Sequence, residues 1–226
     1  MKKITYYLIL VLIFLGLSNS LAPIQQNTPY VQSEQVLPGM FPGAPLSLIL
    51  VDTFYTGVFI KTYYLKLLVF HGFKRSDIYV VRTPKEYWKT TQNYFGMALF
   101  QRGELRNSEN LTPSPPGSLF IGDPSFGGWE IMADGQKVWT FFRAYRTFPD
   151  ELGWGQWRPT FDFYTKMKSY LDNDMPFFGP AHEFGQNGTI SPTSWPEHIS
   201  AAKYQKTTIS EYSKKFYALP SWSKSL

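Results

Sequence analysis

The order of the apolar segments between residues 46 and 121 constrains the fold of this chain more than any other feature of its sequence. Residues 46–51 form a short apolar run with the length of a buried strand. Residues 77–81 and 118–121 are two further runs with the composition of strands. Longer apolar or amphipathic segments separate the three runs. This alternation is typical of parallel βαβ units.

The two intervening segments are interpreted as helices. Residues 54–71 are apolar on most sides, with a narrow polar stripe at Thr62 and Lys66, and this pattern predicts a mostly buried helix that ends before Gly72. The β-branched residues of this segment also allow a strand, but its length favours the helix. The second helix begins at Thr83-Pro84-Lys85-Glu86. Thr83 is in the cap position and Glu86 follows three residues later, which is the pattern of a capping box.

The second half of the chain has a different pattern. Asp134-Gly135 separates two apolar segments, residues 129–133 and 137–143, and this residue pair favours a tight antiparallel hairpin. Thr160 is the predicted cap of a helix over residues 161–171, and Pro196 is the predicted start of a last helix. The expected fold class is therefore α/β, with a short parallel βαβαβ core and an antiparallel hairpin and helices added in the C-terminal half.

Residues 1–22 have the pattern of a cleavable secretory signal peptide. Lys2 and Lys3 precede an apolar run of 12 residues at positions 6–17, and small residues follow at Ser20 and Ala22. This order predicts export and cleavage after Ala22. An uncleaved, tilted membrane anchor is the alternative, although a spanning helix needs about 20 apolar residues.

The mature chain is expected to contain an arm and one domain. Residues 23–45 are rich in Pro and Gln, which predicts an extended arm or linker, and residues 46–226 are expected to form a single globular domain. The chain has no cysteine, which excludes disulfides and thiolate metal sites. An exported domain of this size without disulfides favours a bacterial source and a periplasmic or extracellular location.

The distribution of charge limits the possible partners. The net charge is +5, but two lysines belong to the leader, and residues 200–226 contain five lysines against Glu211 alone. The body between them is close to neutral, which argues against a nucleic-acid partner. Contact with a membrane is expected only through the signal segment or this basic C-terminal tail.

One set of residues suggests a hydrolase. In an open parallel sheet, ligands bind beyond the carboxyl ends of the strands. The predicted strands end near Asp52, Arg82 and Asp123, and a downstream loop rich in turn residues supplies His182 and Glu183. Asp52, Asp123, His182 and Glu183 are therefore candidate catalytic residues for acid–base or metal-assisted hydrolysis. The sequence predicts no metal-ligand set and indicates no particular cofactor.

A second set of residues suggests binding. The aromatic content is 18%, and several tryptophans lie in predicted loops or beside them. These rings can form a platform for sugars, with arginines binding polar groups, or they can fill the seam between the parallel layer and the hairpin layer. The candidate binding residues are Trp129, Trp154, Trp157, Arg143, Arg146 and Arg158, together with Trp195 in the same region.

These observations favour an exported cell-envelope protein. Non-catalytic binding of a cell-wall polymer, a glycan or an envelope protein is the leading interpretation, because no complete catalytic motif is present. A hydrolase that acts at the strand ends is one alternative. A structural subunit of an envelope assembly, held by the arm at residues 23–45, is another.

Overall fold

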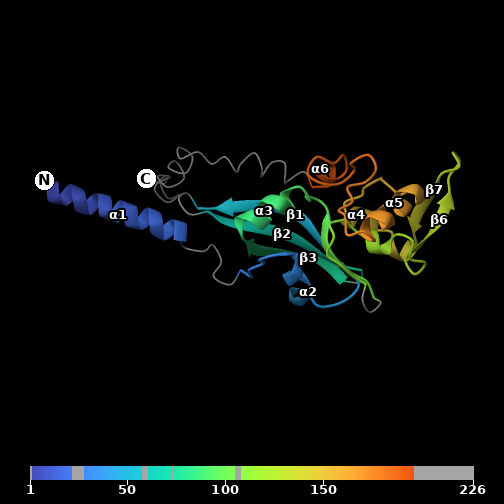
Figure 1. Ribbon diagram of the computed structural model, residues 1–226, viewed down its shortest axis with the longest axis horizontal. Helices are drawn as coiled ribbons and strands as arrows, with labels where there is room; N and C mark the ends of the chain where they lie inside the picture. Colours follow the sequence, from blue (N-terminus) through green and yellow to red (C-terminus); the bar gives the residue numbers. More distant parts are fainter. Residues whose placement is uncertain (1, 22–27, 58–60, 73, 105–107, 196–226) are drawn as a thin grey trace, which may run out of the picture.

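The main sheet of the protein is antiparallel throughout. The computed structural model describes residues 2–21, 28–57, 61–72, 74–104 and 108–195. Five strands pair in the order β3-β2-β1-β4-β5, and every pairing is antiparallel. The strands are β1 (Leu46–Thr56), β2 (Thr62–His71), β3 (Lys74–Thr83), β4 (Ala98–Arg102) and β5 (Glu109–Asn110). Figure 1 shows this sheet in the middle of the molecule.

The predicted parallel βαβαβ core is therefore wrong, and the main cause is the segment at residues 54–71. This segment supplies the end of β1 and all of β2 instead of a helix. Its apolar residues face both sides because β2 is buried on both faces. Leu65 and Leu67 enter one core, whereas Leu68 and Phe70 enter the other. A strand that is covered on both faces loses the alternating pattern by which strands are recognised.

Two further predictions fail in the first half. Residues 118–120, expected as the start of a third strand, form the 3₁₀-helix η2 (Ser118–Phe120). Helix α3 (Lys85–Gln92) starts later and ends earlier than expected, and β4 follows within the segment expected as helix. Pro84 is the N-cap of α3 and no side chain caps this helix, so the predicted capping box of Thr83 and Glu86 does not form.

Two local predictions in the second half are confirmed, the antiparallel hairpin and the helix capped by Thr160. Strands β6 (Gly127–Ile131) and β7 (Lys137–Phe141) form an antiparallel hairpin. Gly135 in its turn has a φ of +82°, which glycine adopts without steric cost. Helix α5 (Phe161–Leu171) is capped by Thr160, whose hydroxyl accepts a hydrogen bond of 3.2 Å from the Phe163 amide. The remaining short helices are η3 (Arg143–Tyr145), α4 (Phe148–Glu151) and α6 (Ser191–Ser194).

The sheet separates two hydrophobic cores. Leu48 and Leu50 of β1 enter the arm-side core, which is closed by residues of the arm and by Trp88 of α3. Ile49 and Val51 enter the C-terminal core, which is closed by the aromatic side chains of the second half. The two faces of β1 therefore hold the arm and the C-terminal half on opposite sides of one sheet.

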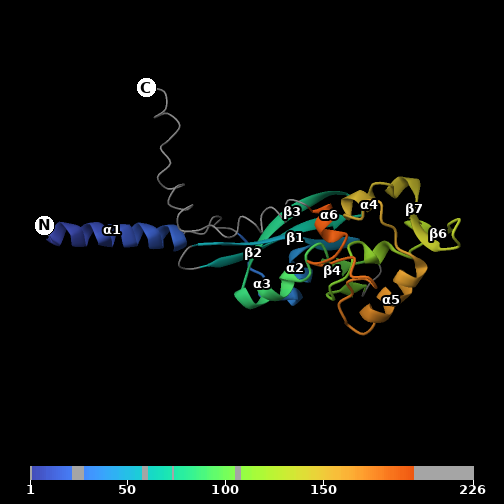
Figure 2. The same ribbon diagram turned by 90° about the horizontal axis from the view of Figure 1, so that it is seen from above.

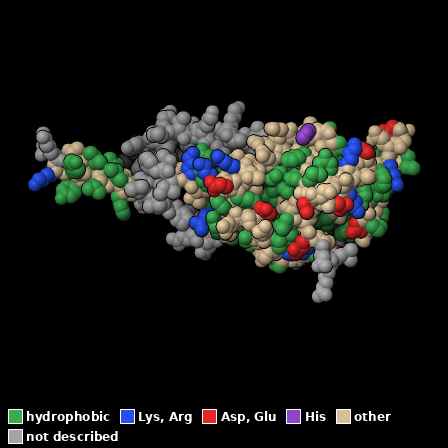
Figure 3. All heavy atoms as spheres, viewed as in Figure 1, with side chains coloured by type: hydrophobic (Ala, Val, Ile, Leu, Met, Phe, Trp, Pro, Cys, Tyr) green, Lys and Arg blue, Asp and Glu red, His purple; other side chains and the backbone are tan. Residues whose placement is uncertain are grey.

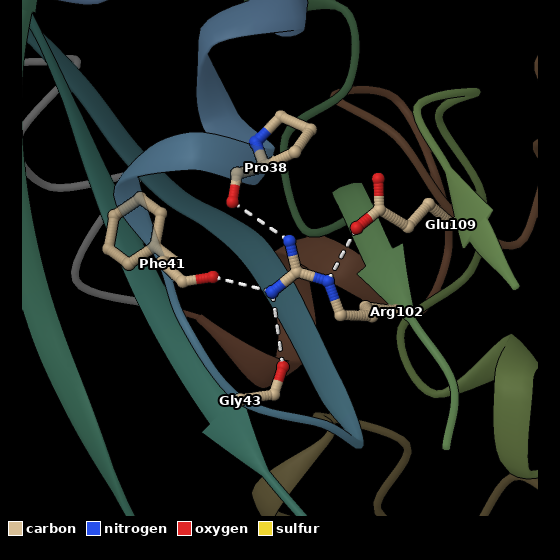
Figure 4. A network of polar contacts seen from close by, with 5 residues as sticks. All are labelled: Pro38, Phe41, Gly43, Arg102 and Glu109. Atoms are coloured by element: carbon tan, nitrogen blue, oxygen red, sulfur yellow. Dashed lines mark hydrogen bonds and ion pairs between the residues drawn. The ribbon is translucent and has the colours of Figure 1, made fainter. Parts of the chain in front are cut away.

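The described part of the arm, residues 28–45, packs against the sheet. It includes η1 (Glu34–Val36) and α2 (Leu37–Met40). Arg82 of the edge strand β3 exchanges main-chain hydrogen bonds of 2.8 Å with Pro29 and Val31. Farther along the arm, Arg102 of β4 donates to the carbonyl oxygens of Pro38 and Phe41 (Figure 4).

The N-terminal segment forms helix α1 (Lys2–Leu21), which extends away from the sheet in both views (Figures 1 and 2). The described side chains from Ile4 to Leu15 are exposed. Among the residues that the structure describes, we find no helix with the length and apolar character needed to cross a membrane. The helix predicted to begin at Pro196 and the basic tail lie outside the described residues.

Candidate functional site

The structure does not provide the shared strand edge that the sequence predicts for Asp52, Arg82 and Asp123. Asp52 lies within β1, directly after a register shift at Leu50, and is paired with Lys66 of β2. Asp123 follows η2, where its carboxylate accepts a hydrogen bond of 2.9 Å from the amide of Ser125. Because the sheet is antiparallel and residues 118–120 are not a strand, the geometric reason for these groups to converge is lost.

His182 and Glu183 lie in a loop after α5. The Glu183 carboxylate accepts a hydrogen bond of 3.0 Å from the amide of Ala181, and it therefore closes the turn in which His182 has a φ of +53°. His182 lines a hollow of about 280 Å³, and neither Asp52 nor Asp123 lines that hollow. Within the described ranges, no group of three or more His, Asp or Glu residues is placed to hold a metal ion.

The candidate tryptophans lie mostly inside the C-terminal core. Trp154 is 2% exposed, and its indole donates a hydrogen bond of 3.0 Å to the carbonyl oxygen of Pro116. Trp157 is half-buried and packs edge-on against Trp154 and Phe163. Trp129 is half-buried against Trp139 and Phe161. These three rings fill the seam between the main sheet, the hairpin and α5.

The candidate arginines are in two different settings. Arg158 is half-buried and donates hydrogen bonds of 2.6 and 2.7 Å to the carbonyl oxygens of Gly155 and Trp157, so it holds its own loop. Arg143 and Arg146 are exposed at η3 and directly after it. The residues between and beside them, Ala144 and Thr147, line a cleft that the sequence does not reveal.

This α4 cleft, which is broad and open to solvent, is the candidate site that we consider in detail. It has a volume of about 770 Å³ and lies between the β2–β3 turn and helix α4. Figure 2 shows α4 beside that end of the strands. The cleft is defined by Leu68, His71, Gly72, Ser76, Ala144, Tyr145, Thr147, Phe148, Asp150, Glu151 and Trp195. Its volume is within the range of pockets that bind small molecules or part of a polymer.

The cleft combines rings with polar groups. Tyr145, Phe148 and Trp195 provide aromatic surface, and the exposed carboxylates of Asp150 and Glu151 provide hydrogen-bond acceptors. The hydroxyl of Ser76 is buried and has no hydrogen-bond partner among the described residues. Asp150 and Glu151 supply the negative charge of the described lining, and this charge favours hydrogen-bond donors and cationic groups.

Local structure fixes the position of Trp195. The hydroxyl of Ser194 donates a hydrogen bond to the carbonyl oxygen of Gly153. Gly153 has a φ of +74°, and a Cβ atom there would lie 3.1 Å from the indole nitrogen of Trp195. The absence of a side chain at Gly153 therefore lets the last described residues approach α4 closely.

The two carboxylates of the cleft, Asp150 and Glu151, come from adjacent positions on α4. Consecutive helical side chains diverge by about 100° around the axis. A pair of carboxylates that shares an acid–base reaction must face the same bond from two sides.

A separate cavity of about 270 Å³ lies between the arm and α3. It is lined by Tyr87 and Tyr94, the two described residues whose side-chain pKa values are clearly shifted. Burial raises the pKa of Tyr87 well above its ordinary value, and the nearby Glu34 carboxylate and Tyr94 raise it further. Burial, and then the charge of Glu34, also raises the pKa of Tyr94. Both phenols therefore stay neutral and belong to the packing of the arm.

Sequence reasoning did not identify most residues of the α4 cleft. A histidine such as His71 and a loop tryptophan such as Trp195 are recognisable as candidates from the sequence. Asp150 and Glu151 belong to no motif. Only the tertiary fold brings these four residues to one cleft. We find no protein-family model, no curated protein and no solved structure that matches this chain. The assignment of a function therefore depends on the geometry.

Proposed function

We propose that this chain is an exported, non-catalytic protein that binds a neutral or amino-sugar segment of a cell-envelope polymer in the α4 cleft. The observation that carries the proposal is the cleft itself, in which three rings, two carboxylates and Ser76 line about 770 Å³. Export is supported by the leader pattern of residues 1–22.

The lining of the cleft suits the two kinds of surface on a sugar ring. The C–H face of a pyranose packs on aromatic rings such as Tyr145 and Trp195, whereas its hydroxyl groups donate to carboxylates such as Asp150 and Glu151. An amino group on the sugar would also be attracted by the two negative charges. The open shape of the cleft allows a longer chain to continue beyond it.

The proposed binding surface differs from the one that the sequence suggests, although both belong to the C-terminal half. The half is aromatic-rich as expected, but Trp154 is buried and Trp129 and Trp157 pack against neighbouring rings. Their substitution tests the stability of the core rather than binding. Trp195 is half-buried at the cleft, so it is the tryptophan whose loss bears on the ligand.

Binding is tested with soluble oligomers of N-acetylglucosamine and glucosamine, measured by calorimetry on the purified full chain. We expect Glu151→Gln and Trp195→Ala each to weaken binding at least tenfold. Asp162→Asn is the matched control, because Asp162 is an exposed carboxylate of α5 that pairs with Lys166 away from the cleft. Equal affinity of the wild type and both cleft variants would exclude this site, and release of cleaved sugar would exclude a non-catalytic role.

Export is tested separately. The N-terminal sequence of natively produced protein should begin at Pro23, directly after the predicted cleavage site. Protein recovered from the membrane fraction that still begins at Met1 would support the anchor instead. Unprocessed protein found only in the cytosol would contradict the envelope role.

A further inference from the structure

A second hollow lies at the opposite end of the β2–β3 pair. Strand β2 has 10 residues, so its two ends are roughly 30 Å apart. One end meets the α4 cleft at His71, and the other meets a hollow of about 420 Å³ beside the start of α3. We call this hollow the basic site, and we define it by Tyr30, Lys61, Tyr63, Arg82, Thr83 and Lys85.

The charged residues among the described lining of the basic site are all cationic. Its charged lining residues are Lys61, Arg82 and Lys85, and the described residues that line it include no aspartate or glutamate. Figure 3 shows Lys and Arg side chains near the part of the molecule that Figure 1 labels α3, with acidic side chains beside them. Three cationic groups around one hollow repel each other, and an anion placed between them relieves that repulsion.

Arg82 is fixed in place but retains an unused donor. Its main chain is held by Pro29 and Val31 of the arm, and its guanidinium carbon lies 5.9 Å from the centre of the Tyr30 ring. The Nε atom is buried and has no hydrogen-bond partner among the described residues. A buried, charged N–H group without an acceptor is unfavourable, so an acceptor that reached this atom would be stabilised.

Thr83, the residue after Arg82 in β3, also lines the hollow. It is 4% exposed, and its hydroxyl is buried without a hydrogen-bond partner among the described residues. The sequence predicts that this hydroxyl caps α3, but Pro84 is the N-cap and α3 has no side-chain cap. The first N–H groups of a helix carry partial positive charge and have no partner within the helix, so they add to the attraction for an anion.

From these contacts we infer that the basic site binds a phosphate ester. One carboxylate would neutralise only one of the three cationic groups, whereas a phosphate monoester carries about −1.5 to −2 at neutral pH and has three acceptor oxygens. The ring of Tyr30, which is 53% exposed, offers apolar surface to the group that the phosphate carries. The phosphate can come from a soluble or polymer ester or from a lipid headgroup, and the chemistry of recognition is the same.

The test measures binding of glycerol 1-phosphate to the purified full chain by calorimetry, with acetate as the carboxylate comparison. We expect Arg82→Gln to weaken binding at least tenfold and Thr83→Val to weaken it several-fold. Lys85→Gln should also weaken it, whereas Lys89→Gln, one helical turn farther along α3 and not part of the lining, should not. Because Lys85 is exposed, this pair of variants remains informative if Arg82→Gln does not fold.

The outcomes separate the possible ligands. Loss of glycerol 1-phosphate binding in the site variants but not in Lys89→Gln supports the inference. No binding by the wild type, equal binding by all variants, or acetate binding as tight as that of the ester would overturn it. Vesicles of phosphatidylglycerol identify the source, since loss of vesicle binding in Lys85→Gln indicates a lipid headgroup, and unchanged vesicle binding beside lost ester binding indicates a soluble or polymer ester.

Discussion

At the scale of single residues, burial controls the behaviour of Tyr87 more than any charge does. Burial is the largest cause of its raised pKa, followed by the Glu34 carboxylate and then by Tyr94. The phenol of the unfolded chain ionises near pH 10, whereas the folded protein keeps it neutral at higher pH. The folded state therefore holds one more proton than the unfolded state above that pH, and stability decreases as pH rises.

We predict that Tyr87→Phe makes the alkaline loss of stability shallower. Below about pH 10 this residue adds no pH dependence, because both states hold the proton. Above it, the free energy of unfolding of the wild type decreases by about 1.4 kcal/mol per pH unit from this residue alone. Urea unfolding at several pH values between about 9 and 11.5 measures the slope. Tyr170→Phe, at an exposed phenol, is the control, and identical slopes for Tyr87→Phe and the wild type would contradict the prediction.

Thr83 shows the limit of sequence reasoning for one residue. Thr83-Pro84-Lys85-Glu86 has every residue of a capping box, and this pattern correctly places the start of a helix within two residues. It does not give the partner of the hydroxyl, because Pro84 adopts an extended conformation at the N-cap. Thr83 instead lines the basic site, which depends on residues of the arm and of β2.

At the scale of elements, the side chain of Arg102 links the arm to strand β4. Arg102 donates hydrogen bonds of 2.8 Å to Pro38, 2.7 Å to Phe41 and 3.2 Å to Gly43, all at carbonyl oxygens, and its Nε lies 2.7 Å from the Glu109 carboxylate (Figure 4). The three carbonyl bonds cross between chain segments about 60 residues apart in the sequence. They determine where the arm runs across β4.

We predict that Arg102→Ala lowers the free energy of unfolding by about 2–3 kcal/mol, because it leaves several half-buried carbonyl groups without a donor. Amide hydrogen exchange at residues 37–43 should become faster. Glu109→Gln removes only the ion pair at a side chain that is 46% exposed, so it should cost about 1 kcal/mol or less. Equal losses in the two variants would show that the ion pair, rather than the carbonyl bonds, holds the arm.

The elements that the sequence predicts correctly are those with local determinants. The hairpin depends on Asp134-Gly135, and the start of α5 depends on Thr160, so each signal lies within a few residues of the structure that it forms. The five-stranded sheet depends on contacts between distant segments, such as Leu48 with Phe100. A residue can be recognised as apolar from the sequence, but its partner strand and the face it occupies are set by the whole fold.

The α4 cleft is a consequence of the same distant contacts. It requires the β2–β3 turn, helix α4 and Trp195 to meet, and no local pattern links these three segments. The expected convergence of Asp52 and Asp123 was argued from a parallel sheet, so the geometric reason for it is lost with that topology. Polar residues of a site can be listed from a sequence, but their grouping requires the topology.

At the scale of the whole molecule, the alternation of side chains along β1 joins the two cores. Ile49 and Leu50 are consecutive and both fully buried, yet Ile49 enters the C-terminal core and Leu50 enters the arm-side core. Neither core can lose its order without disturbing the same strand. We therefore expect residues 28–195 to unfold as one cooperative unit, even though their hydrophobic residues form two clusters.

This expectation is tested by removing each side chain in turn. Ile49→Ala and Leu50→Ala should each lower the free energy of unfolding by about 2–5 kcal/mol, because each leaves a cavity in a packed core. In both variants, urea transitions followed by far-UV circular dichroism and by tryptophan fluorescence should coincide, as in the wild type. If Ile49→Ala separated an early fluorescence transition from a later loss of secondary structure, the C-terminal half would unfold by itself. The α4 cleft would then lie between two independently stable parts, and its affinity for sugars would depend on their docking rather than on one rigid scaffold.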